Sequence, residues 1–438
     1  MLPEYPGGLT QDMLIALAVM AGAYLLIFSE LLHRTSAAII GAVVMIGVGM
    51  VAGFYSQDLA IASVDGNTIL LLTAMMMVVA MLRPTGGFEY VAVVLSKYSH
   101  GDTRLLLIYL SLAVSIISMF LDNVTTVIIF APITILIARI LEVNPMPFLM
   151  AEAMLSNIGG AATLVGDPPN IMIGTAGGID FTRFIIHMGP TIFLVWLCTV
   201  LLILFLFRRH LPKVDRPVDL DERRAIHDSA GLKRSLFALA VIIALFFIHH
   251  LLDIYPAYAA FIGLCIVLIL ERPEPGALFG EVNWSVLAFF VGLFIIVGGV
   301  ESSGLLHWVG LQLVDLARDP EKLLITGLAV MWSAALLSAV VDNIPFTVTI
   351  IPIVLGLESM GVNITPLWWA LAIGVGLGGN GTHIGATANL IAITESERCG
   401  IRGAAITPMG WMKIGIPTML YSLIIASLAY SLFFSTFL

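Results

Sequence analysis

Two aspartate–asparagine pairs interrupt strongly apolar stretches of this chain at matching positions. Asp122 and Asn123 lie within SMFLDNVTTVIIFAPI in the first half, and Asp342 and Asn343 lie within SAVVDNIPFTVTIIPI in the second. A carboxylate at bilayer depth costs about 3 kcal/mol or more, and such residues mark ion pathways. The first pair is followed by Thr125, which offers an additional hydroxyl. These residues are therefore predicted to bind a small ion.

Three roles are open for the two aspartates. Their carboxylates and the neighbouring amides are oxygen ligands of the kind that hard cations prefer, so Asp122, Asn123, Asp342 and Asn343 are possible sodium ligands. Proton carriage is an alternative, because an apolar environment disfavours the charged form of a carboxyl group. A purely structural role as helix N-caps is the third. We expect sodium or a proton as the coupling ion, and no other cofactor.

A second pair of motifs follows the first. GGAATLVGDPPN (159–170) aligns without gaps with GGNGTHIGATAN (378–389), so the spacing between the two motifs is the same in both halves to within one position. Glycines and prolines do not sustain a helix, so each apolar span is predicted to unwind there and to turn carbonyls and helix N-termini toward a ligand. Close helix packing through small residues is the competing explanation, and it accounts for the glycines only.

The polar residues of the second pair complete the candidate site. We expect Thr163, Asn170, Thr382 and Asn389 to line one cavity together with the tips that carry the aspartates. His383 has a side chain that titrates near neutral pH, although a hydrogen-bonded structural histidine is an equal alternative. Glu152 is a weaker candidate. The candidate ligand residues of these motifs are Gly160, Thr163, Asp167, Asn170, Gly379, Asn380, Thr382, His383 and Asn389.

Membrane-spanning helices must position these residues. Of 438 residues, 59% are apolar and 11% are charged, whereas roughly a quarter would be charged in a soluble protein. The N-terminal segment has no basic residue, so the first span is expected to be a permanent anchor and not a cleaved signal. Ten spans are predicted from the apolar runs, at about 13–29, 36–53, 67–82, 147–174, 189–207, 236–252, 256–271, 284–300, 365–391 and 413–436.

Two further apolar stretches, about 104–141 and 323–358, are too long for one crossing. Each is interrupted near its middle by an Asp-Asn pair. This pattern favours a re-entrant hairpin of two half-length helices that meet at a polar tip, because irregular backbone at membrane depth is tolerated only inside protein or beside water. The alternative is two ordinary crossings joined by an exposed turn.

The charge pattern predicts orientation and an internal repeat. With the N-terminus outside, 17 of the 20 lysines and arginines, Arg34 among them, lie in segments expected to be cytoplasmic, and three lie outside. The polar linker 208–235 separates a first repeat, 1–207, from a second, 236–438. Five crossings per repeat make the second repeat inverted. The predicted fold is all-α and polytopic, with inverted five-span repeats, two re-entrant hairpins and two broken helices, in the plasma membrane with both termini outside.

The four motifs resemble those of the ArsB/NhaD branch of the ion transporter superfamily, and most closely those of the P-protein permeases. The resemblance covers nearly the whole chain, but the long hydrophilic N-terminal extension of the animal P proteins is missing and His383 departs from the expected apolar residue. It implies an elevator-type transporter that forms a homodimer. Arsenite permeases, sodium/proton antiporters and carboxylate carriers share this architecture, so the resemblance leaves the substrate open.

A secondary active transporter of a small ion or anion is therefore the predicted function. An intramembrane aspartyl protease is a remote alternative, because Asp167 follows Gly166 but the first glycine of a Gly-x-Gly-Asp motif is absent. No His-Glu-x-x-His motif and no Gly-Lys dipeptide occurs, so zinc proteolysis and P-loop ATP hydrolysis are unsupported. We expect no enzyme activity, no ATPase domain and no nucleic-acid partner. A channel stays open, since a repeat does not distinguish a carrier from a pore.

Overall fold

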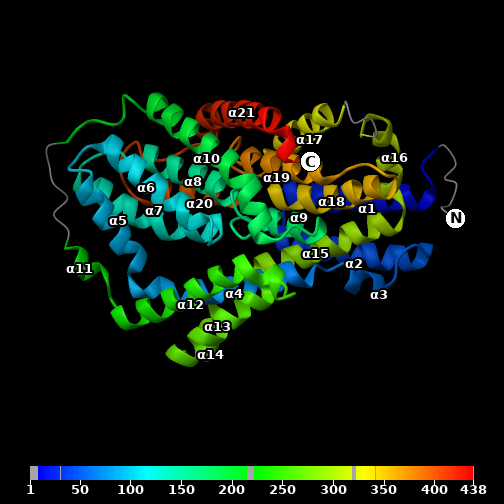
Figure 1. Ribbon diagram of the computed structural model, residues 1–438, viewed down its shortest axis with the longest axis horizontal. Coiled ribbons are helices and arrows are strands. Elements are labelled where there is room, and N and C mark those ends of the chain that lie inside the picture. Colours follow the sequence, from blue (N-terminus) through cyan, green and yellow to red (C-terminus); the bar gives the residue numbers. More distant parts are fainter. Residues whose placement is uncertain (1–7, 30, 215–220, 318–321, 341, 438) are drawn as a thin grey trace.

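The protein is built from helices in the part that the structure describes. This computed structural model describes residues 8–29, 31–214, 221–317, 322–340 and 342–437. Within these ranges it forms helices and one isolated β-bridge, with no strand. Most helices run along the longest axis of the molecule (Figure 1). The predicted all-α class is confirmed.

The helices of the first half have counterparts in the second half, in the same order. The first set is α1 (Gln11–Phe28), α2 (Arg34–Ala52), α3 (Gln57–Ala62), α4 (Gly66–Leu82), α5 (Gly87–Tyr98), α6 (Thr103–Ser118), α7 (Asn123–Ile140), α8 (Met146–Gly160), α9 (Pro168–Ala176) and α10 (Phe181–Leu206). The second set is α12 (Ser229–Ile248), α13 (Pro256–Glu271), α14 (Pro275–Gly280), α15 (Trp284–Ser302), α16 (Leu305–Ala317), α17 (Leu323–Ser338), α18 (Asn343–Ser359), α19 (Thr365–Gly378), α20 (Thr387–Arg398) and α21 (Pro408–Leu432). From α3 to α9, the separation in sequence between the start of each helix and the start of its counterpart is nearly constant.

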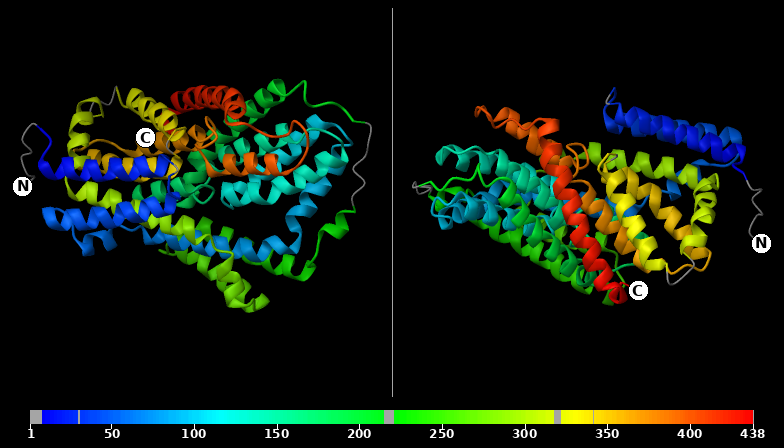
Figure 2. Two further views of the ribbon diagram at one scale, coloured as in Figure 1. Left: turned by 180° about the vertical axis from the view of Figure 1, so that it is seen from behind. Right: turned by 90° about the horizontal axis from the view of Figure 1, so that it is seen from above.

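The described residues also form four short elements. The helix α11 (Glu222–Ala225) lies in the linker between the two sets. The 3-10 turns η1 (Arg83–Thr85), η2 (His249–Leu251) and η3 (Phe434–Thr436) follow α4, α12 and α21. The α6–α7 hairpin and the α17–α18 hairpin enter from opposite ends of the molecule (Figure 1), and the other views show the same separation (Figure 2). This arrangement is that of an inverted repeat.

Each of the ten predicted spans corresponds to a helix or a broken helix. Six of them are long and apolar enough to cross a membrane, namely α2, α4 continued by the turn Arg83–Thr85, α10, α12, α15 and α21. The apolar helices of α1 (Gln11–Ile27) and α13 are shorter, and the remaining two spans are the pairs α8/α9 and α19/α20. The short helices α3, α5, α14 and α16 lie outside the predicted spans, because their sequences are not long apolar runs.

The two hairpins differ from the prediction in the length of their arms. The arms have 16 to 18 residues, and α7 is long enough by itself to cross a membrane, so "half-length" was wrong. The alternative of an exposed turn is also wrong, because Asn123 is 3% exposed and Asn343 is 6% exposed. The tips are buried because each meets the other repeat at the centre of the molecule.

Equivalent polar caps begin equivalent helices. The Asp65 carboxylate accepts a hydrogen bond from the main-chain N–H of Thr68 (3.2 Å) at the start of α4. Asn283 accepts one from the N–H of Val286 (3.3 Å) at the start of α15, the counterpart of α4 in the second repeat. Such caps satisfy otherwise free N–H groups in the first turn. The caps therefore define the first residue of each helix, at equivalent positions in the two repeats.

Candidate functional site

The two hairpin tips and the two helix breaks meet at a central cavity of about 180 Å³. Four helices begin at its wall, and their first residues Asn123 (α7), Pro168 (α9), Asn343 (α18) and Thr387 (α20) all line it. A helix N-terminus carries roughly half a positive charge and presents free N–H groups. The cavity wall is therefore suited to an anion.

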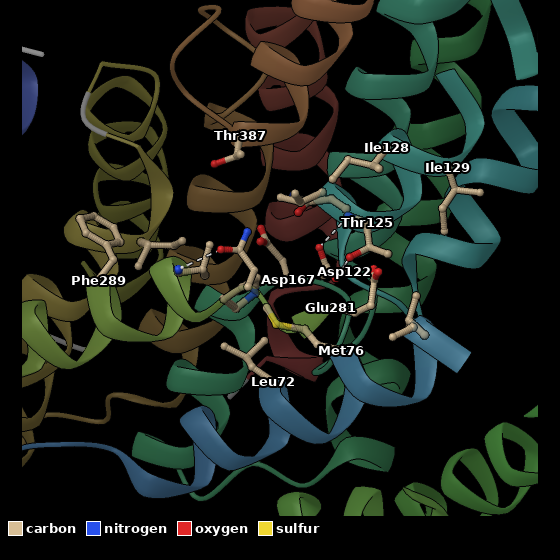
Figure 3. A pocket seen from close by; sticks show the side chains of 18 of the residues that line it. Leu72, Met76, Asp122, Thr125, Ile128, Ile129, Asp167, Glu281, Phe289 and Thr387 are labelled. Carbon is tan, nitrogen blue, oxygen red and sulfur yellow. Dashed lines mark hydrogen bonds between the residues drawn. The ribbon is translucent and has the colours of Figure 1, made fainter. Parts of the chain in front are cut away.

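Asp122 is tied to its own helix. One carboxylate oxygen accepts a hydrogen bond from the main-chain N–H of Thr125 (2.8 Å), and the other accepts one from the Thr125 hydroxyl (2.5 Å). Both residues line the cavity (Figure 3). This is the N-cap arrangement considered as a structural alternative, and here it coincides with a place at the cavity wall.

Asp342 occupies the equivalent position but does not cap its helix. The third residue of α18 is Pro345, which has no N–H to donate, where α7 has Thr125. Asp342 Oδ2 instead lies 3.4 Å from Nη1 of Arg34, and Oδ1 is buried without a hydrogen-bond partner among the described residues. Its backbone φ is +51°, an uncommon conformation for a residue other than glycine.

Asp167 links the first break to the second hairpin. The side-chain amide of Asn343 donates to both of its carboxylate oxygens, at 3.3 and 3.0 Å. Asp167 is 2% exposed and lines the cavity (Figure 3). The two repeats thus share a buried polar contact at the cavity wall.

A buried asparagine that the motifs did not include joins the first hairpin tip to the second helix break. Asn157 of α8 accepts a hydrogen bond from Asn123 (2.9 Å) and donates to Asn380 (2.9 Å) and Asn389 (3.0 Å). All four side chains are at most 3% exposed. Asn157 escaped prediction because its counterpart in the aligned second repeat is Gly376, so the comparison of repeats does not reveal it.

The asparagines of the second pair of motifs stabilise the loops in which they lie. Nδ2 of Asn170 donates to the carbonyl oxygens of Gly160 (3.2 Å) and Thr163 (2.9 Å). Nδ2 of Asn389 donates to the carbonyls at the two equivalent positions, at 2.7 and 2.8 Å. These bonds close each break into a compact loop.

The two threonines of these motifs are anchored equally. The hydroxyl of Thr163 donates to the carbonyl of Met119, and that of Thr382 donates to the carbonyl of Ala339. Each hydroxyl also accepts a main-chain N–H at 3.1 Å, from Gly166 and Gly385 respectively. Each break is thereby bonded to the hairpin of its own repeat.

The predicted shared cavity lined by these motif residues is not what the structure contains. Thr163, Asn170, Thr382 and Asn389 are not among the residues that line the cavity. They lie behind its wall, because their polar groups are used by main-chain carbonyls and amides. The other candidates that do not line it are Gly160, Asp342, Gly379, Asn380 and His383.

The glycines of these motifs support close packing. A Cβ atom on Gly159 would lie 2.5 Å from the carbonyl oxygen of Ser115 in α6, and one on Gly378 would lie 2.5 Å from that of Ala335 in α17. Gly160 and Gly379 in turn face the backbone of Gly166 and of its counterpart. The packing explanation is therefore right for the glycines, while the polar residues have the bonding roles described above.

Two weaker candidates lie away from the cavity wall. Glu152 is buried, and one of its carboxylate oxygens accepts a hydrogen bond from the Thr134 hydroxyl at 2.5 Å. His383 is half-buried, and its Nδ1 has no partner among the described residues. Neither side chain is among those that line the cavity.

Arg34 is the charged cavity residue that the sequence analysis assigned elsewhere. It was counted as a loop arginine, yet it is the first residue of α2 and lines the cavity. Nη1 donates to the Thr387 hydroxyl at 3.1 Å, and the guanidinium lies 5.5 Å from the centre of the Phe289 ring. A cation at a helix N-terminus is disfavoured by the helix dipole, and this was the available signal that Arg34 has an anionic partner.

One end of the cavity leads toward His227 and Asp228 of the linker, and the face on which these two residues lie is hereafter the linker face. A wider cavity of about 690 Å³, bordered by His227 and Asp228 of the linker, shares Ala80, Arg83 and Glu281 with the central one. Arg83 and Glu281 lie 3.9 Å apart, and both side chains are more than half exposed. An exposed ion pair contributes about 1 kcal/mol or less, so this contact is a weak barrier.

A third cavity, of about 200 Å³, occupies the equivalent position in the other repeat. In the alignment of α4 with α15, its residues Phe294, Val297, Gly298 and Glu301 correspond to Met76, Val79, Ala80 and Arg83 of the central cavity. Ser63 and Asp65 likewise correspond to Glu281 and Asn283. The repeat therefore relates the central cavity to a counterpart built from the equivalent residues of the other half.

Comparison with known proteins agrees with this architecture. The family model described as "citrate transporter" matches residues 24–374. An uncharacterized transporter of Mycobacterium tuberculosis is 37% identical over 409 residues, which cover 91% of this chain and 93% of that protein. The 46 kDa membrane protein of Mycobacterium leprae is 35% identical over 421 residues, or 92% and 97% of the two chains.

Two further likenesses concern the resemblance and the fold. The human P protein is 30% identical over 506 residues, which cover 95% of this chain and 59% of that protein, so the resemblance to P proteins is confirmed. The crystal structure of the YdaH transporter of Alcanivorax borkumensis, described as having an unusual topology, matches with a TM-score of 0.59. That match covers 92% of this chain and 98% of the other at 14% identity, and it concerns the fold alone.

Proposed function

The chain belongs to the citrate transporter family of membrane transporters, and we propose that it carries a small anion across the membrane, coupled to sodium ions or protons. Citrate is the first candidate substrate, because the matching family model is named for it. The proposal extends to the plasma membrane as location, with both termini outside, and to a homodimer with an elevator movement.

The observation that carries the anion proposal is the convergence of four helix N-termini and Arg34 on one cavity. Each N-terminus contributes the partial positive charge of its helix dipole, which favours an anionic ligand. A guanidinium group adds a planar set of donors that matches a carboxylate. A cavity of about 180 Å³ suits a small anion.

A second candidate, sodium/proton antiport, has its own supporting observation. Three aspartates, Asp122, Asp167 and Asp342, hold the N-cap positions of three of these four helices. Carboxylates at this depth are typical of cation and proton pathways. Arsenite permease activity stays within the proposal as another small-ion substrate.

Flux measurements on the purified protein in liposomes distinguish these functions. We expect saturable uptake of labelled citrate, accelerated by internal citrate and by an inward gradient of sodium or protons. Sodium/proton exchange with no movement of citrate, small carboxylates or arsenite would assign the antiporter instead. Flux that does not saturate and shows no counterflow would indicate a channel.

A further inference from the structure

Arg34 has donors to spare at the cavity wall. Both of its hydrogen bonds, to Asp342 (3.4 Å) and to Thr387 (3.1 Å), come from Nη1. Nε and Nη2 donate to no group among the residues that the structure describes. The side chain is 32% exposed and lines the cavity. Arg34 can therefore accept a carboxylate through two parallel N–H bonds, the geometry in which arginine binds carboxylates most strongly.

Asp342 is held more weakly than Asp122. It accepts no hydrogen bond as a cap, because Pro345 removes the donor that Thr125 supplies to Asp122. Oδ1 is buried with no partner in the described part of the chain, and Oδ2 makes a single long contact. A buried acceptor without a partner is costly. Asp342 is thus the aspartate of the centre that is free to exchange its partner.

We propose that Asp342 and the transported anion compete for Arg34. A substrate carboxylate binds Arg34 through Nε and Nη2 and takes up the single positive charge of the guanidinium. The long contact of 3.4 Å between Nη1 and Asp342 is then lost, and the released Asp342 carboxylate binds the coupling cation. This inference rests on the proposed function and assigns its two ligands to two named residues. Arg34 holds the anion, and Asp342 holds the cation.

The charges around the pair explain why the exchange requires a cation. Asp122 faces the cavity from the start of α7, and Asp167 faces it from the break before α9. At the linker face, Arg83 and Glu281 lie 3.9 Å apart and compensate each other. When an anion occupies Arg34, Asp342 loses its counter-charge and no described cation is left to replace it. One cation must therefore enter for each displaced aspartate, and this links cation entry to anion entry.

Citrate counterflow in liposomes, with no ion gradient, tests the exchange. Removing the internal competitor by Asp342→Asn should lower the half-saturation concentration of citrate about fivefold, the equivalent of about 1 kcal/mol. In a separate uptake assay with an imposed gradient, Asp342→Asn should also abolish acceleration by sodium or protons, and the gradient that accelerates the wild type identifies the cation. Arg34→Gln should raise the half-saturation concentration at least about tenfold.

A second variant keeps the charge of Asp342. Pro345→Thr restores the N–H and hydroxyl that cap Asp122 in the first repeat, so it should draw Asp342 away from Arg34. We expect it, too, to lower the half-saturation concentration of citrate. The matched control is Glu358→Gln, the same charge change at an exposed position of α18, which should alter neither parameter.

The outcomes separate the inference from the proposed function. One outcome is that the wild type transports citrate while Asp342→Asn and Arg34→Gln leave the half-saturation concentration and the gradient acceleration unchanged. In that case the Arg34–Asp342 pair is structural and the inference is wrong. A raised half-saturation concentration in Pro345→Thr would also overturn it. If the wild type carries no citrate at all, the proposed citrate transport fails, and the inference falls with it.

Discussion

Asp122 and Asp342 occupy the same position in the two repeats and make different bonds. Asp122 uses both oxygens to cap α7 through Thr125, whereas Asp342 contacts Arg34 and leaves Oδ1 without a partner in the described ranges. From the sequence, the Thr125 hydroxyl is an additional ion ligand beside Asp122. In the structure the same hydroxyl satisfies Asp122 within its own helix, so we expect Asp342 to have the larger part in ion coupling.

The capping role of Asp122 predicts a graded response to substitution. Asn is about as good an N-cap as Asp, whereas Ala costs about 1 kcal/mol. We therefore expect Asp122→Asn to leave the thermal unfolding temperature of the purified protein nearly unchanged and Asp122→Ala to lower it. Equal destabilisation by both substitutions would show that the charge, and not the cap, stabilises the first tip.

Asn157 is predicted to stabilise the junction of the two repeats. Asn157→Ala removes three buried hydrogen bonds, and unsatisfied buried amides cost about 1–3 kcal/mol. We expect a clear drop in thermal unfolding temperature. Asn363→Ala is the control, because that side chain is exposed and caps only the start of α19. An unchanged Asn157→Ala protein would mean that water replaces the lost amide.

At the scale of the elements, each break is held against the hairpin of its own repeat. The Thr163 hydroxyl reaches the Met119 carbonyl before the first tip, and the Thr382 hydroxyl reaches the Ala339 carbonyl before the second. Hairpin and broken helix are therefore expected to move as one unit. Independent movement would expose carbonyls that nothing else described satisfies at that depth.

Replacing glycine by alanine is expected to have opposite effects on stability at Gly159, where two helices pack closely, and at Gly356, where space is available. Gly159→Ala places a methyl group 2.5 Å from the Ser115 carbonyl oxygen, and over-packing of this kind costs about 1–3 kcal/mol. Gly356 lies inside α18 with nothing within 4 Å of an added Cβ, so Gly356→Ala should stabilise by about 0.5–1 kcal/mol. Thermal unfolding of the two purified variants measures both. Destabilisation by Gly356→Ala alone would contradict the packing explanation.

At the scale of the whole molecule, the repeat relates the central cavity to the third cavity. Met76 borders the central cavity, and its counterpart Phe294 borders the third cavity. In a variant without Cys198, Cys265 and Cys399, we expect Met76→Cys to react with an impermeant thiol reagent from the linker face. Phe294→Cys should react from the opposite face only, and citrate with the coupling cation should change the two rates in opposite directions. Rates that change in parallel would contradict alternating access.

The direction of the molecule in the membrane is tested by labelling intact cells. In the same cysteine-free background, Ser56→Cys should be labelled from outside, and Ala225→Cys in the linker should be protected. The physical reason is the charge bias of 17 to three. The reverse labelling would invert the expected topology.

The sequence by itself determined the helical class, the spans, the two hairpins and the two breaks. Apolar length and breaker residues are local properties, and the nearly constant spacing between matching motifs makes the second half an internal check on the first. It also identified Asp122, Asn123, Thr125, Asp167 and Asn343, which line the cavity, because polar residues inside apolar spans are conspicuous.

Only the tertiary structure decided which polar residues face the cavity and which support it. Like Asn343, Thr163 and Asn170 are polar residues inside an apolar span, yet their side chains donate hydrogen bonds to main-chain carbonyls. Arg34 lies at the end of a short loop in sequence and meets Asp342 from the opposite half of the chain. Partners this distant leave no trace in local composition, because an ion pair depends on where folding brings two side chains and not on their neighbours along the chain.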